Sequence, residues 1–248
     1  MKEIQAVLFS GGKGKRLFPI GDYYQKVMMP LGEKGIPVLE YIIRHLAYYG
    51  VNKFVVLIGY RANQIRRYFG NGEKFGVEIQ YVKDKENVKG TGAALLNARE
   101  MITEKNMLIY YTDILSNFNV KRLLDFHNSH KKVGSVWTDP SWRIPEGVIK
   151  KTADNKVTSI DYNPQQINAN TGISILSTRV FDYLGEFMEN KDGKLVIDLS
   201  SDIFPRLVDE RQIAAFPSDE WWIDLGNLYR YKSINDTLLS EKYSHFIR

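Results

Sequence analysis

Alternating strand and helix patterns along the first 140 residues most constrain how this chain can fold. Short apolar runs typical of buried strands occur at residues 4–9, 53–59, 77–82, 107–111 and 133–138. Segments with helical periodicity lie between them, at residues 37–50, 63–69, 92–102 and 120–130. Strands that alternate with helices of roughly ten to fifteen residues are typical of βαβ units, in which helices cover both faces of a parallel sheet. We therefore predict an α/β fold with a Rossmann-like, doubly wound and mostly parallel sheet.

The sequence pattern changes after residue 140. Two short strand-like runs flank the turn ADNK (153–156), which predicts a hairpin. Further strands are expected at 171–177 and 213–216, and helices at 199–209 and from about 228 to 243. No linker, low-complexity tract or internal repeat separates the two parts. We predict one domain over residues 1–248, with a smaller and partly antiparallel second layer beside the main sheet.

A glycine-rich and positively charged loop follows the first predicted strand. The stretch AVLFSGGKGKRLFP (6–19) places three glycines and three cations between residues 11 and 16. Glycines let backbone N–H groups approach a ligand closely, and the cations select an anion, so phosphate is the expected ligand. Asp113 follows the predicted strand 107–111. Because the carboxyl ends of parallel strands share one edge of a sheet, we expect the loop and Asp113 to line one crevice.

Two common phosphate-binding motifs do not fit this loop. A Walker loop requires Ser or Thr after Gly-Lys, and here Arg16 follows Lys15. A dinucleotide fingerprint that starts at Gly12 requires Gly or Ala where Leu17 stands. It also requires an acid at the end of the second strand, where the sequence reads Gly-Tyr-Arg (59–61). Neither motif explains the loop.

Composition narrows the classes of function further. The chain has no cysteine, which excludes disulfides, thiolate nucleophiles and zinc–thiolate sites. The formal net charge of +5 suits a partner that carries phosphate. No basic run exceeds two residues, so nucleic acid is not an expected partner. The sequence shows no signal-peptide pattern and no apolar stretch near the roughly 18 residues of a membrane span, so we expect a cytoplasmic protein with no membrane partner.

Seven motifs in order, with the two-part signature counted as one, resemble those of the sugar-1-phosphate nucleotidyltransferases. The family usually shows G-G-x-G-T-R-L-x-P followed by P-K-x-x-x-P, and this signature is similar to GGKGKRLFP (11–19) and KVMMP (26–30). The resemblance continues with VLIGYRANQI (56–65), GTGAAL (90–95), Asp113 at the end of a hydrophobic strand, EGVI (146–149), NTGISIL (170–176) and WWIDLG (221–226). These matches extend over residues 4–235, which is nearly the whole chain.

This resemblance implies an enzyme that condenses a nucleoside triphosphate with a sugar 1-phosphate, giving a nucleotide sugar and pyrophosphate. The attacking phosphate oxygen is largely ionised at pH 7, because its second pKa is about 6, so no general base is required. The sequence indeed offers no Ser-His-Asp or Cys-His arrangement. Catalysis then rests on positioning two anions and on stabilising charge, for which cations and Mg²⁺ suffice. Homo-oligomers are common in the family.

The resemblance also implies a role for each matched residue. Arg16 and Lys26 would be the catalytic cations, and Asp113 and Asp224 would hold Mg²⁺. The nucleotide would contact Gly11, Gly12, Lys13, Gly14, Lys15, Gly90 and Thr91. The acceptor would contact Glu146, Gly147, Tyr162, Asn170 and Thr171. Residues 1–113 would form the nucleotide-binding half, 114–226 the half that binds the acceptor phosphate, and 227–248 a C-terminal helix.

Several positions depart from the family pattern. Lys15 stands in place of Thr and Gln25 in place of Pro, and the segment 83–89 lacks the residues that usually frame the base, so base choice stays open. The family's E-K-P is YNP (162–164) here, which removes an acid and a lysine from the acceptor side. Lys150 or Lys151 is a candidate to replace that cation. We therefore expect glucose 1-phosphate to be a poor acceptor.

Two other functions remain open at this level. One is nucleotidyl transfer onto a non-sugar phosphate such as phosphocholine. The other is a regulatory module that binds a nucleotide sugar without turnover, although Arg16, Lys26, Asp113 and Asp224 are all present.

Overall fold

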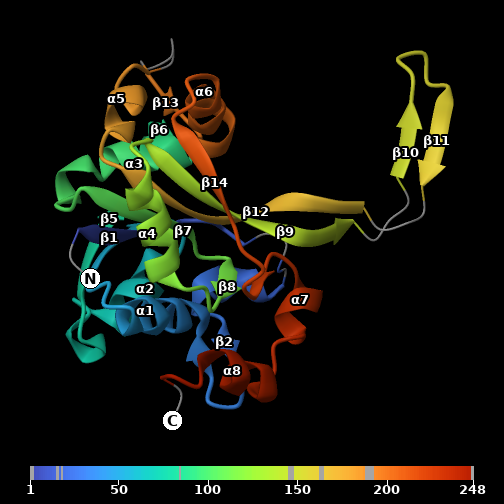
Figure 1. The fold of residues 1–248 in the computed structure, drawn as a ribbon. Helices are drawn as coiled ribbons and strands as arrows, with labels where there is room; N and C mark the ends of the chain where they lie inside the picture. The colour runs from blue at the N-terminus through green and yellow to red at the C-terminus, as the bar shows by residue number, and fades with distance from the viewer. Residues whose placement is uncertain are drawn as a thin grey trace.

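A seven-stranded sheet forms the centre of the molecule (Figure 1). The structure is a computed structural model that describes residues 3–14, 17, 19–83, 85–144, 148–161, 165–187 and 193–246. In sheet order the strands are β14 (Ile213–Pro217), β9 (Gly134–Ile144), β12 (Gln165–Ser177), β7 (Asn106–Tyr111), β1 (Ile4–Ser10), β4 (Lys53–Ile58) and β5 (Glu78–Lys83).

Four of the six neighbouring strand pairs in this sheet are parallel, and six of its seven strands run in the same direction. β1 pairs in parallel with β4 and with β7, β4 with β5, and β14 with β9. β12 is the exception, since it runs antiparallel to both β7 and β9. The predicted α/β fold with a mostly parallel sheet is thus confirmed.

Helices cover both faces of the sheet, and the side chains of each strand alternate between two cores. Leu8 of β1 packs in one core and Val7 in the other. The first core contains side chains of α1 (Val38–Tyr48), α2 (Ala62–Phe69), α4 (Val120–Ser129) and α8 (Asp236–Tyr243). The second contains side chains of α3 (Thr91–Asn97), α5 (Val180–Leu184), the π-helix η6 (Leu199–Ile203) and α6 (Phe204–Asp209). A strand buried on both faces reads as a continuous apolar run, as the sequence does here.

Four small strand pairs complete the fold. Three are antiparallel: β2 (Pro30–Leu31) with β3 (Ile36–Pro37), β8 (Ile114–Ser116) with β15 (Trp222–Asp224), and β10 (Val148–Lys151) with β11 (Val157–Asp161). β6 (Val88–Lys89) and β13 (Leu195–Val196) pair in parallel. The β10–β11 pair is the predicted hairpin, and Figure 1 shows it projecting away from the main sheet. The smaller, partly antiparallel second layer therefore exists as these separate pairs.

Three predicted helices differ from the observed ones. The final helix is divided into α7 (Leu228–Lys232) and α8, because the Asn235 side chain accepts a hydrogen bond from the N–H of Leu238 and starts a new helix. The helix predicted at 92–102 ends at Asn97 and continues as the 3₁₀ turn Arg99–Met101. The helix predicted at 199–209 opens with the π-helical turn η6. No helix in the described part of the chain is long and apolar enough to cross a membrane.

Candidate active site

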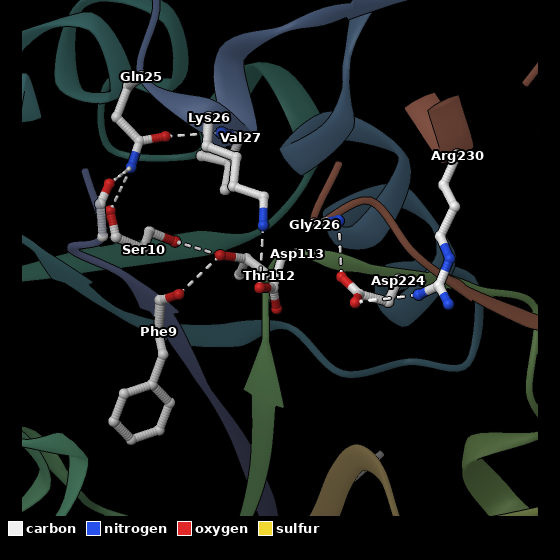
Figure 2. Close-up of polar contacts among 11 residues, drawn as sticks. Phe9, Ser10, Gln25, Lys26, Val27, Thr112, Asp113, Asp224, Gly226 and Arg230 are labelled. Atoms are coloured by element: carbon white, nitrogen blue, oxygen red, sulfur yellow. Dashed lines mark hydrogen bonds and ion pairs between the residues drawn. The ribbon is translucent and has the colours of Figure 1, made fainter. Parts of the chain in front are cut away.

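A cavity of about 460 Å³ opens at the carboxyl edge of β1 and β7. The residues that line it are Phe9, Ser10, Gly11, Gly12, Gln25, Lys26, Val27, Leu57, Val88, Lys89, Gly90, Thr91, Ala94, Tyr111, Thr112 and Asp113. The glycine-rich loop and Asp113 thus share one crevice, as the parallel topology predicts. Hydrogen bonds join the end of β1 to the residues that follow β7. The Thr112 hydroxyl donates to the carbonyl of Phe9 at 2.7 Å, and Ser10 Oγ lies 3.2 Å from Thr112 Oγ1 (Figure 2).

The described part of the glycine-rich loop contributes backbone to this cavity. Gly11 and Gly12 are in its wall, whereas Lys13 is exposed to solvent. Gly14 has a φ of +62°, and a Cβ there would lie 3.2 Å from Cβ of Lys26. Glycine at this position therefore lets the loop turn in a left-handed conformation against the Lys26 side chain. Lys15 and Arg16 lie outside the described residues.

Gln25 connects the loop to the segment that carries Lys26. Its side chain is buried, with an exposed fraction of 1%. Nε2 donates to the carbonyls of Ser10 at 2.6 Å and Gly12 at 3.4 Å, while Oε1 accepts the N–H of Val27 at 2.6 Å (Figure 2). The sequence alone shows Gln25 only as a departure from proline. A buried amide side chain can cross-link three backbone groups, which proline cannot do.

Lys26 and Asp113 form an ion pair in the wall of the cavity. Lys26 opens the 3₁₀ turn η3 (Lys26–Met28), and Asp113 follows β7. Lys26 Nζ lies 2.9 Å from Asp113 Oδ2, and the exposed fractions of the two side chains are 13% and 33%. The cation is therefore largely removed from water, while the carboxylate still faces the cavity.

A second cavity, also of about 460 Å³, meets the first at Tyr111 and Asp113. Its lining residues are Tyr111, Asp113, Ile114, Ala169, Asn170, Thr171, Gly172, Ser200, Trp222, Asp224 and Arg230. Two ligands, one in each cavity, would thus face each other across the Asp113 carboxylate.

Asp224 is brought beside Asp113 by the pairing of two short strands. β15 pairs with β8, so that Asp224 is opposite Ile114, and the N–H of Leu225 donates to the carbonyl of Asp113 at 2.7 Å. The Asp224 carboxylate accepts the N–H of Gly226 at 2.6 Å on Oδ1 and pairs with Arg230 Nη1 at 3.1 Å on Oδ2. Figure 2 shows Lys26 and Arg230 extending toward the two carboxylates from different sides.

Gly90 and Thr91 belong to a packed corner of the first cavity. A Cβ at Gly90 would lie 2.2 Å from the carbonyl oxygen of Ile197, so only glycine allows this close approach. Thr91 Oγ1 donates to Asp198 Oδ2 at 3.1 Å and accepts the N–H of Leu199 at 2.9 Å. The Thr91 hydroxyl therefore ties α3 to η6.

Tyr111 separates this corner from the second cavity. Its hydroxyl donates to Thr91 Oγ1 at 3.4 Å, and its ring stacks on Phe9 with 5.2 Å between centroids. Burial raises the pKa of Tyr111, although the hydrogen bond with Thr91 opposes that shift. The phenol thus stays protonated at neutral pH. Sequence reasoning missed Tyr111, Ser200 and Arg230. Tyr111 lies at the end of β7, whereas Ser200 and Arg230 join the site through the packing of distant elements.

The residues predicted to meet the acceptor fall into two groups. Asn170 and Thr171 line the second cavity. Asn170 Oδ1 accepts the N–H of Gly172, and the buried Thr171 hydroxyl donates to the carbonyl of Trp137 at 3.0 Å. Glu146, Gly147 and Tyr162 lie outside the described residues, as does Asn163. The two lysines considered as replacement cations, Lys150 and Lys151, are exposed on the β10–β11 hairpin.

The two tryptophans of the WWIDLG segment have different surroundings, and Trp222 is the one that lines the second cavity. The indole N–H of Trp222 donates to Asp139 Oδ2 at 2.9 Å, and Trp221 packs edge-on to Tyr243. Asp139 is buried, which by itself raises its pKa, but hydrogen bonds from Ser141 and Trp222 outweigh burial and lower that pKa overall. The carboxylate is therefore a stable anchor for one wall of the second cavity.

Two pairs of a cation and a carboxylate, Lys26 with Asp113 and Arg230 with Asp224, thus lie where two cavities meet on a Rossmann-like sheet. The family model described as Nucleotidyl transferase matches residues 5–241. The chain therefore belongs to the nucleotidyl transferase family.

Named relatives agree with this assignment. The chain is 28% identical to the UTP–glucose-1-phosphate uridylyltransferase of Synechocystis sp. over 247 residues, covering 92% of this chain and 61% of that protein. It is 27% identical to the D-glycero-alpha-D-manno-heptose 1-phosphate guanylyltransferase of Aneurinibacillus thermoaerophilus, covering 90% of this chain and 93% of that protein. The chain thus spans less than two thirds of the first relative and nearly all of the second.

The fold is also that of a solved structure, UDP-glucose pyrophosphorylase complexed with UDP-glucose. The TM-score is 0.69 at 18% identity, covering 94% of this chain and 97% of the other. At this identity the similarity concerns the fold.

Proposed function

We propose that this chain transfers a nucleotidyl group from a nucleoside triphosphate to a sugar 1-phosphate, forming a nucleotide sugar and pyrophosphate. One observation carries the proposal: two cavities of about 460 Å³ each meet at Asp113, where the ammonium of Lys26 lies 2.9 Å from the carboxylate. A transfer between two anions needs two adjacent compartments and a cation at their junction. The two relatives described above carry the names of sugar-1-phosphate nucleotidyltransferases.

On this proposal the first cavity holds the nucleoside triphosphate. Backbone N–H groups of Gly11 and Gly12 would face the phosphates, and Lys26 would neutralise the α-phosphate. Arg16 would meet the β- and γ-phosphates, as the family resemblance implies. Residues 1–113 would then supply the nucleotide-binding half and residues 114–226 the acceptor half. We place the proposed activity in the cytoplasm, as expected from the sequence.

The donor set at the junction fits Mg²⁺. Asp113 and Asp224 present carboxylate oxygens to the same cavity, and Mg²⁺ prefers such oxygens together with substrate phosphates and water. Among the described residues no group of three or more His, Cys, Asp or Glu is arranged to hold a metal by protein ligands alone. We therefore expect the Mg²⁺ ion to be bound by two carboxylates together with oxygens of the substrates. When bound, the ion would neutralise charge on the phosphates.

The chemistry is a displacement at the α-phosphorus. An oxygen of the acceptor phosphate forms a bond to that phosphorus while the bond to the bridging α–β oxygen breaks, and pyrophosphate leaves with the electron pair. No proton must be removed from the nucleophile at neutral pH. The residues of this chain would therefore have to orient the two substrates and hold Lys26 beside the transferring group, and the ion pair with Asp113 supports that position of Lys26.

The proposal is tested with a matrix of five nucleoside triphosphates against several phosphates, read by pyrophosphate release. The acceptors are glucose 1-phosphate, mannose 1-phosphate, a heptose 1-phosphate and phosphocholine, each with and without Mg²⁺. Release that requires a sugar 1-phosphate and stops on chelation is expected. Pyrophosphate release with phosphocholine alone would show that the acceptor is not a sugar phosphate. Binding of a nucleotide sugar with no pyrophosphate release under any condition of the matrix would refute catalysis.

A further inference from the structure

Helix α7 carries one side chain into the second cavity. Asn227 precedes the helix, and its side chain accepts the N–H of Arg230 at 2.9 Å, which fixes the backbone from which the guanidinium extends. Arg230 reaches back to Asp224 at the end of β15, six residues earlier, and lines the cavity beside Asn170 and Thr171. The exposed fraction of the Arg230 side chain is 35%, so the guanidinium is partly withdrawn from water and still faces the cavity.

The charges that line this cavity make Arg230 distinctive. Among the described residues in its wall, Asp113 and Asp224 are the acids and Arg230 is the one Lys or Arg side chain. A phosphate dianion that entered would meet two carboxylates, so it needs a cation in the same wall. Lys26 lines the first cavity, on the other side of Asp113.

The guanidinium of Arg230 is chemically suited to binding a phosphate. A guanidinium offers five N–H donors in a planar fork that matches the oxygens of a phosphate, and it can hold a carboxylate and a phosphate at once. Asp224 Oδ1 accepts the N–H of Gly226, which orients the carboxylate and, through it, the Arg230 fork.

We propose that Arg230 binds the phosphate of the acceptor and restricts the second cavity to phosphorylated acceptors. This assignment rests on the proposed nucleotidyl transfer. It locates the acceptor cation on α7, whereas sequence reasoning considered Lys150 and Lys151 of the exposed hairpin. On this assignment, Asp113 and Asp224 would hold the Mg²⁺ ion, and Arg230 would bind the acceptor phosphate that attacks the nucleotide.

The test compares R230Q and R230K with R206Q as the matched control. Arg206 of α6 is paired with Glu186 at 2.6 Å, has a similar exposed fraction of 34%, and does not line either cavity. Steady-state kinetics are measured at saturating Mg²⁺, with each substrate varied in turn. We expect R230Q to raise the acceptor KM by about ten-fold to a hundred-fold and to leave the nucleotide KM unchanged. R230K should raise the acceptor KM less, since it keeps the charge and loses the fork, and R206Q should match the wild-type chain.

The outcomes separate this assignment from the function on which it rests. An active R230Q with a wild-type acceptor KM would overturn the assignment while the proposed function stands, even if kcat falls, because Arg230 would then act only by holding Asp224. A wild-type chain that turns over no sugar 1-phosphate would refute the function and the assignment together. If R230Q does not fold, as judged by its thermal melting curve, the acceptor KM of R230K decides, and an unchanged value overturns the assignment.

Discussion

The Lys26 ammonium lies 2.9 Å from the Asp113 carboxylate, joining residues that are 87 positions apart in the chain. Lys26 follows the glycine-rich loop, and Asp113 follows the central strand β7. Both proposed substrates would meet at this pair, since Asp113 lines both cavities. A charge pair at such a junction holds a cation in place before the substrates arrive, which is how a preorganised site stabilises developing charge.

Replacement of Asp113 by Asn should reduce turnover by about a hundred-fold or more, because the variant loses both the carboxylate proposed to hold Mg²⁺ and the partner of Lys26. Pyrophosphate release at saturating substrates measures the effect. The control is Asp125→Asn, which breaks an exposed ion pair with Lys121 on α4 and should leave turnover unchanged. Wild-type turnover in Asp113→Asn would remove this carboxylate from the catalytic site.

Lys26→Ala should lower kcat more than it raises the nucleotide KM. Negative charge on the transferring phosphate is greatest in the transition state, so a cation beside it contributes most there. Lys53→Ala removes a cation of similar type that pairs with Glu104 outside either cavity, and it should have little effect. If the KM rises while kcat stays constant, Lys26 contributes to uniform binding only.

Gln25→Leu should destabilise the fold and weaken nucleotide binding together. The substitution leaves the carbonyl of Ser10 and the N–H of Val27 without the partners they have in the structure, at a cost of roughly 1–3 kcal/mol for each buried group. Urea unfolding and the nucleotide KM report the two effects.

Gln64→Ala provides the control for this variant, since it removes the acceptor of the Gln25 backbone N–H and the donor to the Tyr23 carbonyl but leaves the bonds of the Gln25 side chain in place. It should lose less stability than Gln25→Leu. Equal losses in the two variants would show that the Gln25 side chain does not link the loop to Lys26.

The sequence was sufficient to predict the parallel sheet and the meeting of the glycine-rich loop with Asp113. Both follow from local patterns, namely apolar runs for buried strands and the shared edge at which parallel strands end. The position of Arg230 in the second cavity could not be predicted from local patterns, because it depends on the pairing of β15 with β8 and on the helix cap at Asn227. The sequence did contain one usable signal, an Asn three residues before the arginine, which marks the start of a short helix directly after Asp224.

Stability should fall as the solution is acidified from pH 6.5 toward pH 4. Burial lowers the pKa of His45 and that of His127 to about 4, whereas an unfolded histidine titrates near 6.5. Between these values the unfolded chain binds protons that the folded chain does not bind. The contribution of these histidines to the free energy of unfolding is therefore complete above pH 6.5. It is lost as the pH falls, by up to about 3 kcal/mol for each histidine.

Urea unfolding at pH 7.5, 6 and 5 measures this dependence. His45 packs against His245, with 3.3 Å between ring nitrogens, and its Nε2 donates to the carbonyl of Phe118. His45→Gln retains a donor for that carbonyl and removes the titrating ring, so its free energy of unfolding should depend less steeply on pH. An unchanged pH dependence would show that His45 is not one of the responsible groups.

Labelled nucleotide tests the central claim, transfer of the α-phosphoryl group between the two cavities, most directly. The triphosphate and sugar 1-phosphate that react best are incubated with the chain, once with a label on the α-phosphate and once with a label on the γ-phosphate. The account predicts that the α-label appears in the nucleotide sugar and the γ-label in pyrophosphate, in equal amounts and only when the acceptor is present. A γ-label in the sugar product, or an α-label released as free nucleoside monophosphate without an acceptor, would contradict it.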